Sequence, residues 1–147
     1  MKLSPHFSFE ELTNTSHKEY LEANRKHGRR NIEKLKDLAD FLETVRDLLG
    51  CPIIISSGIR CPELNKKVGG VPSSQHMHCE ASDIIPTGIS IPDAFEKIYK
   101  SNLVFDQLIL ERSRGKEWIH ISYTGFADRR QALVYDGKRY TVYKGQQ

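Results

Sequence analysis

A chain of 147 residues is long enough for one domain with a hydrophobic core. Its 38% hydrophobic and 28% charged content is typical of a globular protein, and no apolar run approaches the roughly 20 residues that span a membrane. The net charge of +3 is mild, and the basic run Arg25–Arg30 is interpreted as a solvated helix end. We therefore expect one domain over residues 1–147, a monomer with no nucleic-acid partner and no membrane insertion.

The three cysteines are Cys51, Cys61 and Cys79. An odd number argues against a complete disulfide framework, and we interpret all three as reduced thiols. The opening segment MKLSPHFSFEEL lacks the apolar stretch of a signal peptide. We therefore expect the protein to be cytoplasmic as synthesised.

The N-terminal half predicts helices followed by one strand. Ser8 and Glu11 in FSFEEL have the spacing of a capping box, which predicts a helix start. Residues 31–49 carry apolar side chains at three- and four-residue intervals, and Gly50 ends that run. The segment PIIIS (52–56) predicts a buried strand, and the Gly- and Pro-rich stretch after it predicts a loop with one turn of helix at ELNKKV.

The C-terminal half predicts mainly strands. ASDII (81–85), FDQLILE (105–111) and WIHISY (118–123) predict strands, and IPDAFEKIYKS predicts a helix with Pro92 in its first turn. ALVYDGKRYTVY predicts a hairpin that turns at Asp136 and Gly137. The fold class expected from this order is α+β, with N-terminal helices packed on a mostly antiparallel sheet.

The stretch SSQHMHCEASD concentrates the side chains that bind zinc: imidazole, thiolate and carboxylate. Asp83 follows Ala81 and precedes Ile84 in a predicted strand, an expensive place for a carboxylate that is neither paired nor ligating. Alternation in WIHISY places His120 on the face opposite to the apolar one. With His76, these residues make a set of two histidines and one aspartate, which leaves a fourth zinc position for water.

A second arrangement of ligands remains open at this point. His76, His78, Cys79 and Cys61 could form a closed structural zinc site without a position for water. That arrangement leaves the strand residues Asp83 and His120 unexplained.

The chain resembles the zinc D-Ala-D-Ala carboxypeptidase family from end to end, especially its short phage and prophage members. The resemblance rests on SPHFSFEELTNTS, IIISSGIRCPELNKKVGG, SSQHMHCEASDI, FDQLILE and WIHISY. Its core is a Ser-x-His segment with an aspartate seven residues after the histidine, and a later Trp-x-His. The resemblance implies the Hedgehog/DD-peptidase fold and one Zn²⁺ per chain, bound by His76, Asp83 and His120.

The resemblance also implies roles for residues that do not bind the metal. Arg60 matches an arginine that contacts substrate and stabilises the charged transition state, and Ser74 and Trp118 match substrate-binding positions. Glu117 is the leading catalytic base, because Glu117-x-x-His120 reproduces an acid-x-x-His spacing of related dipeptidases. Strand alternation places Glu117 away from His120 unless the strand begins at Trp118.

Two further carboxylates, Glu111 and Asp106, are kept as reserve candidates for the base. The chain departs from the family pattern at two positions: Cys79 replaces a usual glycine and Ile59 a usual aromatic residue. The first departure matters if the backbone at residue 79 adopts a positive φ.

The expected activity is hydrolysis of a peptide bond in peptidoglycan stem peptides by a zinc-bound water, of D-Ala-D-Ala carboxypeptidase or endopeptidase type. A cytoplasmic enzyme of this kind reaches the cell wall after release by another route. The alternative is a catalytically inactive, zinc-bearing domain that binds cell wall or serves as a phage structural part.

Overall fold

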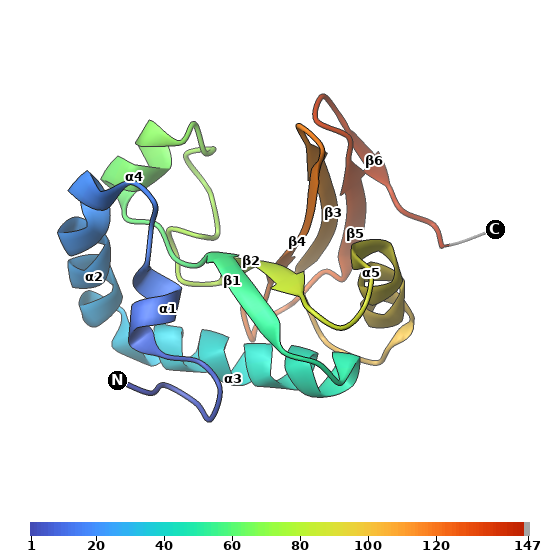
Figure 1. Ribbon diagram of the computed structural model, residues 1–147, viewed down its shortest axis with the longest axis horizontal. Helices are drawn as coiled ribbons and strands as arrows, with labels where there is room; N and C mark the ends of the chain where they lie inside the picture. Colours follow the sequence, from blue (N-terminus) through green and yellow to red (C-terminus); the bar gives the residue numbers. More distant parts are fainter. Residues whose placement is uncertain (146–147) are drawn as a thin grey trace. The chain divides into compact units, whose positions relative to one another are not determined.

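The computed structural model describes residues 1–145 (Figure 1). These residues form two compact units. Met1–Glu43 and Ser57–Ser82 form the first unit, and Thr44–Ser56 and the residues from Asp83 onward form the second. The helices are α1 (Phe9–Thr13), η1 (a 3-10 helix, Lys18–Tyr20), α2 (Leu21–Arg30), α3 (Ile32–Leu49), α4 (Pro62–Lys67) and α5 (Ile91–Lys100). The strands are β1 (Ile53–Ser57), β2 (Ala81–Pro86), β3 (Gln107–Ser113), β4 (Lys116–Ser122), β5 (Gln131–Tyr135) and β6 (Tyr140–Val142).

The first unit is helical, and its first helix starts as the sequence predicts. The Ser8 hydroxyl accepts a hydrogen bond from the Glu11 amide, and the Glu11 carboxylate accepts one from the Ser8 amide, so the predicted capping box is confirmed. The predicted long helix is α3, and Gly50 follows it with a φ of +69°. The short helix predicted at ELNKKV is α4, which begins one residue earlier at Pro62.

Asn24 of α2 fixes the segment that follows β1. Its side chain is buried, its Nδ2 donates to the carbonyls of Thr13 and Ile59 at 2.7 and 3.2 Å, and its Oδ1 accepts from the Cys61 amide at 2.8 Å. One amide side chain therefore satisfies three backbone groups from two segments. Arg60 lies between Ile59 and Cys61, so the hydrogen bonds of Asn24 fix the backbone on both sides of Arg60.

We expect Asn24→Ala to lower the free energy of unfolding by about 3 kcal/mol or more, because each buried polar group left unsatisfied costs about 1–3 kcal/mol. Lys26→Ala, an exposed change on the same helix, is the matched control and is expected to stay within about 0.5 kcal/mol of the wild type. Urea unfolding followed by circular dichroism measures both variants. Equal midpoints for the two would contradict the structural role assigned to Asn24.

The second unit is built on a six-stranded sheet with the strand order β1-β2-β4-β3-β5-β6 (Figure 1). The pairs β3–β4 and β5–β6 are antiparallel, and β3–β5 is parallel. The sheet is therefore mixed, and the chain has the predicted α+β class. The predicted hairpin is formed by β5 and β6, and Gly137 in its turn has a φ of +97°.

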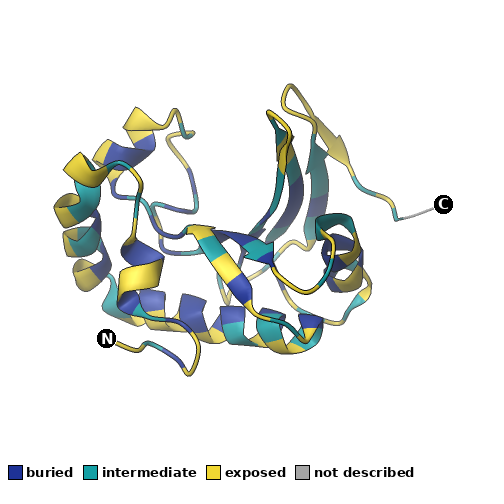
Figure 2. Ribbon diagram, viewed as in Figure 1, coloured by how far each residue is buried: buried dark blue, intermediate teal, exposed yellow. Residues whose placement is uncertain are grey.

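The two faces of β3 and β4 differ in what covers them. Leu108, Leu110, Ile119 and Ile121 alternate onto one face, where they are almost fully buried, and α5 packs on these two strands. The other face carries His120. Figure 2 shows dark-blue buried segments alternating with teal intermediate ones along the inner strands, and the exposed edge strand β6 in yellow.

Among residues 1–145, no helix is long and apolar enough to cross a membrane. The three cysteines are free thiols, as the sequence predicts.

Candidate metal centre

Asp83 and His120 come from neighbouring strands of the sheet in the second unit. Asp83 lies on β2 and His120 on β4, and the two strands are adjacent. The His120 Nδ1 atom lies 3.2 Å from Asp83 Oδ1, and both side chains are only 12% exposed. β2 is buried along nearly its whole length, so the Asp83 carboxylate occupies a place where an aspartate needs a polar partner or a metal ion.

His76 lies in the loop between α4 and β2, and backbone contacts fix this loop within the first unit. The Arg60 amide donates to the His76 carbonyl at 3.0 Å, and His27 Nε2 donates to the Met77 carbonyl at 2.7 Å. The His76 ring itself donates from Nδ1 to the Gly58 carbonyl at 2.6 Å. A carbonyl can only accept, so the proton of the neutral ring is on Nδ1 and the lone pair is on Nε2.

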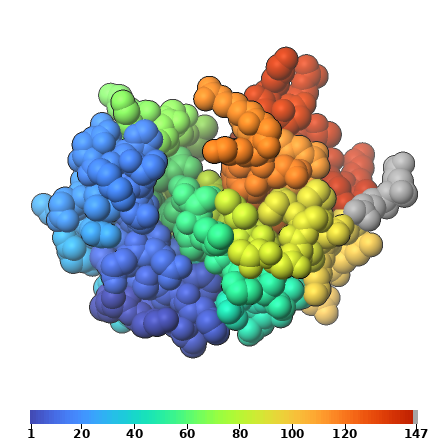
Figure 3. Space-filling view, in the orientation of Figure 1, coloured from blue at the N-terminus to red at the C-terminus, as the bar shows by residue number. Residues whose placement is uncertain are grey.

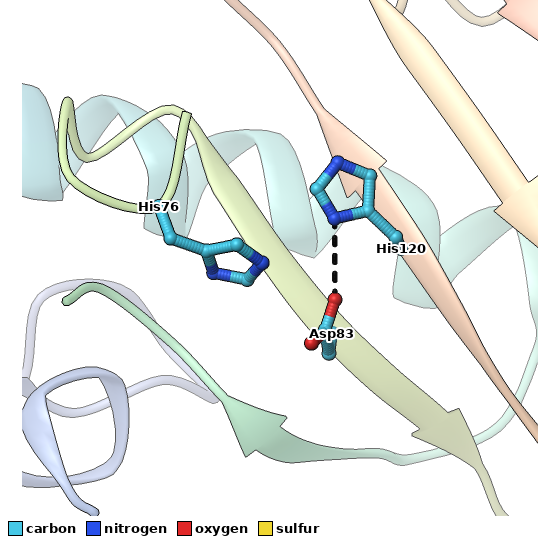
Figure 4. Close-up of side chains that lie close together, drawn as sticks. All are labelled: His76, Asp83 and His120. Carbon is cyan, nitrogen blue, oxygen red and sulfur yellow. Dashed lines mark hydrogen bonds and ion pairs between the residues drawn. The ribbon is translucent and has the colours of Figure 1, made fainter. Parts of the chain in front are cut away.

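His76, Asp83 and His120 form a set whose ligand atoms all lie within 4.8 Å of one another, and within residues 1–145 it is the one such set of three or more (Figure 4). The chemistry of this set fits zinc, which is bound by imidazole nitrogen and carboxylate oxygen in four-coordinate sites. The hydrogen bond from His76 Nδ1 to a carbonyl is the contact that fixes the ring of a metal-binding histidine. The closed site of His76, His78, Cys79 and Cys61 is not formed.

Two histidines and one aspartate that lie this close together and are largely shielded from solvent could hold one metal ion, in the manner of mononuclear metal hydrolases. The family model for Peptidase M15 matches residues 5–122, most of the chain. The chain therefore belongs to the Peptidase M15 family, the family of the zinc D-Ala-D-Ala carboxypeptidases, as the sequence resemblance predicts. These proteins are zinc metallopeptidases. No curated protein sequence matches the chain significantly.

Cys79 has a backbone φ of +57°, in the left-handed region that favours glycine. Cys79 therefore replaces the family's usual glycine at a position where the backbone conformation is energetically unfavourable for other residues. The thiol is buried, and burial raises the pKa of Cys79 to about 11. It is protonated near neutral pH and is a poor metal ligand in this environment.

We expect Cys79→Gly to retain one zinc per chain, because the thiol is not in the ligand set and glycine suits the backbone. Metal analysis after dialysis, with circular dichroism to verify the fold, measures the outcome. Loss of zinc from a correctly folded Cys79→Gly protein would instead favour a cysteine-containing site.

Arg60 and Ser74, the residues expected to contact substrate, lie on the segments that hold His76. Arg60 Nη1 donates to Asn65 Oδ1 at 3.0 Å, which fixes one side of the guanidinium. The buried Ser74 hydroxyl accepts a hydrogen bond from the His76 amide at 3.3 Å. Ser74 is thus also part of the turn that presents His76.

The three carboxylates considered as the base have different surroundings. β4 begins at Lys116, so Glu117 lies within the regular strand, and alternation turns it to the face opposite His120. The Glu117 carboxylate accepts from Arg112 Nε at 2.7 Å across the β3–β4 pair. Asp106 is buried and accepts from the backbone amide, Nε and Nη2 of Arg129.

Glu111 shares the face of the sheet that carries His120. It lies opposite Trp118 in the β3–β4 register, and His120 lies opposite Ile109, so Glu111 and His120 are diagonal neighbours. Diagonal neighbours lie about 7–8 Å apart, with their Cβ atoms somewhat closer, which is within reach of a long side chain such as glutamate. Trp118 Nε1 donates to Glu111 Oε2 at 2.7 Å, which orients the carboxylate.

Two contributions to the site were not anticipated from the sequence. Asn24 and His27 of α2 hold the segments that carry Arg60 and His76, and no local pattern indicated these long-range contacts. The pairing of Glu111 with Trp118 could have been anticipated by aligning FDQLILE and WIHISY as antiparallel neighbours, but the register was not predicted.

Proposed function

We propose that the protein is a single-domain zinc peptidase that hydrolyses a peptide bond in peptidoglycan stem peptides, of D-Ala-D-Ala carboxypeptidase or endopeptidase type. The observation that carries the proposal is the close grouping of His76, Asp83 and His120, the first two buried, in a chain of the Peptidase M15 family. These three residues would hold one Zn²⁺. Bound there, zinc supplies Lewis acidity, which lowers the pKa of water to about 7 and polarises the scissile carbonyl.

The residues of the chain have the remaining tasks of the reaction. A carboxylate must accept a proton from water and pass it to the leaving amine. We propose Glu111 for this task, because it lies on the face of His120 and Trp118 orients it. Glu117 remains the alternative, on the strength of its spacing from His120.

Arg60 is proposed to stabilise the negative charge that develops on the carbonyl oxygen, since a guanidinium stays protonated at any pH of interest. Its contact with Asn65 limits the conformations of the side chain before substrate binds. Ser74 and Trp118 are proposed as substrate contacts.

The test is digestion of purified muropeptides by zinc-loaded protein, with mass spectrometry of the products. The substrates are a stem peptide ending in D-Ala-D-Ala and a cross-linked muropeptide, because they distinguish the carboxypeptidase from the endopeptidase reaction. We expect a zinc-dependent mass loss in at least one of them. If neither is cleaved while zinc is bound, the inactive cell-wall-binding or structural domain is the better description.

A further inference from the structure

The hairpin formed by β5 and β6 continues the face of the sheet on which His120 lies. The strand registers pair Trp118 with Glu111, Glu111 with Tyr135, and Tyr135 with Tyr140. Paired residues on neighbouring strands point to the same face, so these four side chains form one row across β4, β3, β5 and β6. The next row contains His120, Ile109, Leu133 and Val142.

The outer end of this row is an exposed aromatic surface. The rings of Tyr135 and Tyr140 lie 4.6 Å apart, centroid to centroid, at a tilt of 37°, and Tyr140 is 57% exposed. Figure 3 shows the β5–β6 hairpin, in red, at the molecular surface. Partial burial raises the pKa of the Tyr140 hydroxyl above its usual value, and the negative charge of Glu111 makes a smaller contribution in the same direction.

The hairpin is fixed at both ends. In its turn, Asp136 Oδ1 accepts from the amides of Lys138 and Arg139 at 2.8 and 2.9 Å. After β6, the Tyr143 ring packs edge-on against Phe95 and Tyr99 of α5, and its hydroxyl donates to the Glu96 carboxylate. A surface held in this way loses little conformational entropy when a ligand binds.

The family match ends at residue 122, so the hairpin lies outside the part of the chain that the family model covers. All three residues of β6 are exposed, so the core does not require their side chains. The exposed Tyr140 ring therefore lies on the same face of the sheet as His120 and is available to contact a ligand.

We propose that Tyr135 and Tyr140 form a binding subsite for the peptide chain of the substrate, beyond the residues at the scissile bond. The inference rests on the proposed peptidase function. Three strand intervals of about 4.8 Å separate β4 from β6, a span of about 14 Å. An extended peptide covers that span with about four residues, so the subsite distinguishes long peptides from di- and tripeptides.

The test measures binding by the fluorescence of Trp118, the single tryptophan of the chain, which stands in the same row. D-Ala-ended stem peptides of two to five residues are titrated into the metal-free protein, where no hydrolysis occurs. For the wild type we expect Kd to fall as the peptide reaches four residues. For Tyr140→Ala we expect about 3- to 10-fold weaker binding of the five-residue peptide and no change for the dipeptide, the range typical of aromatic contacts.

Two further variants control for the integrity of the hairpin. Thr141→Ala changes the neighbouring exposed residue, which alternates to the opposite face, and is expected to bind like the wild type. Tyr140→Phe keeps the ring and is expected to stay within about twofold of the wild type. Equal affinity of Tyr140→Ala and wild type for every peptide would overturn the subsite, and would identify the tyrosine pair as a stabilising cross-strand contact only. This binding result is independent of muropeptide cleavage, so failure of the subsite and failure of the proposed peptidase activity are distinguishable.

Discussion

Replacing His120 with alanine is expected to abolish stoichiometric zinc binding. The wild type should retain one zinc per chain after dialysis, and His120→Ala only traces. Loss of an outer partner of a ligand already weakens metal binding about 10- to 100-fold, so loss of a ligand should raise Kd by more than about 100-fold. The Asp83 carboxylate would also lose its 3.2 Å contact with His120 Nδ1.

His78→Ala is the matched control, because His78 is an exposed histidine two residues from His76 and is not in the ligand set. It is expected to keep full zinc occupancy. Inductively coupled plasma mass spectrometry gives the metal content, and circular dichroism verifies that both variants fold. Full occupancy in folded His120→Ala would show that the ligand assignment is wrong.

Glu111→Gln is expected to lower kcat by at least about 100-fold while leaving zinc content unchanged. General acid–base steps contribute about 10²- to 10⁴-fold, and glutamine keeps the shape of the side chain but cannot take a proton. KM should change less than kcat, because the carboxylate acts mainly in the transition state. Trp118 can still donate its hydrogen bond to the amide oxygen of the glutamine.

Glu117→Gln is the paired variant and is expected to keep kcat within a few fold, because Glu117 faces away from His120 and pairs with the half-exposed Arg112. Both variants are assayed on the muropeptide that the wild type cleaves. A large loss of kcat in Glu117→Gln, with near-normal turnover by Glu111→Gln, would return the role of the base to Glu117.

The grouping of the candidate metal ligands, and most of the elements that carry them, could be predicted from the sequence, because the signals are local. The capping box at Ser8, the periodicity of residues 31–49 and the alternation in WIHISY each lie within one element. His76, Asp83 and His120 were predicted as one set, and their ligand atoms lie close together in the structure. Their role as zinc ligands remains a prediction.

The arrangement of the carboxylates was not predictable in the same way, because it depends on where β4 begins and on the register of two strands distant in sequence. A strand that starts at Lys116 places Glu117 opposite to His120, and the β3–β4 register brings Glu111 beside Trp118. The parallel pairing of β3 with β5 was likewise not predicted, because the hairpin predicted over residues 132–143 does not indicate which strand of the sheet it joins or in which direction.

The close approach of Gly58 to α1 connects the orientation of the His76 ring to a part of the chain outside the candidate ligand set. A Cβ at residue 58 would lie 2.2 Å from the Leu12 carbonyl oxygen, and that same oxygen accepts from the Ile59 amide at 2.9 Å. The Gly58 carbonyl in turn accepts the His76 Nδ1 proton. In variants shortened at the N-terminus, or selected for tighter zinc binding, the structural order of the first twelve residues should therefore be measured together with zinc affinity. The contacts of Leu12 and Gly58 thus connect the first helix of the chain to the hydrogen bond that orients the His76 ring.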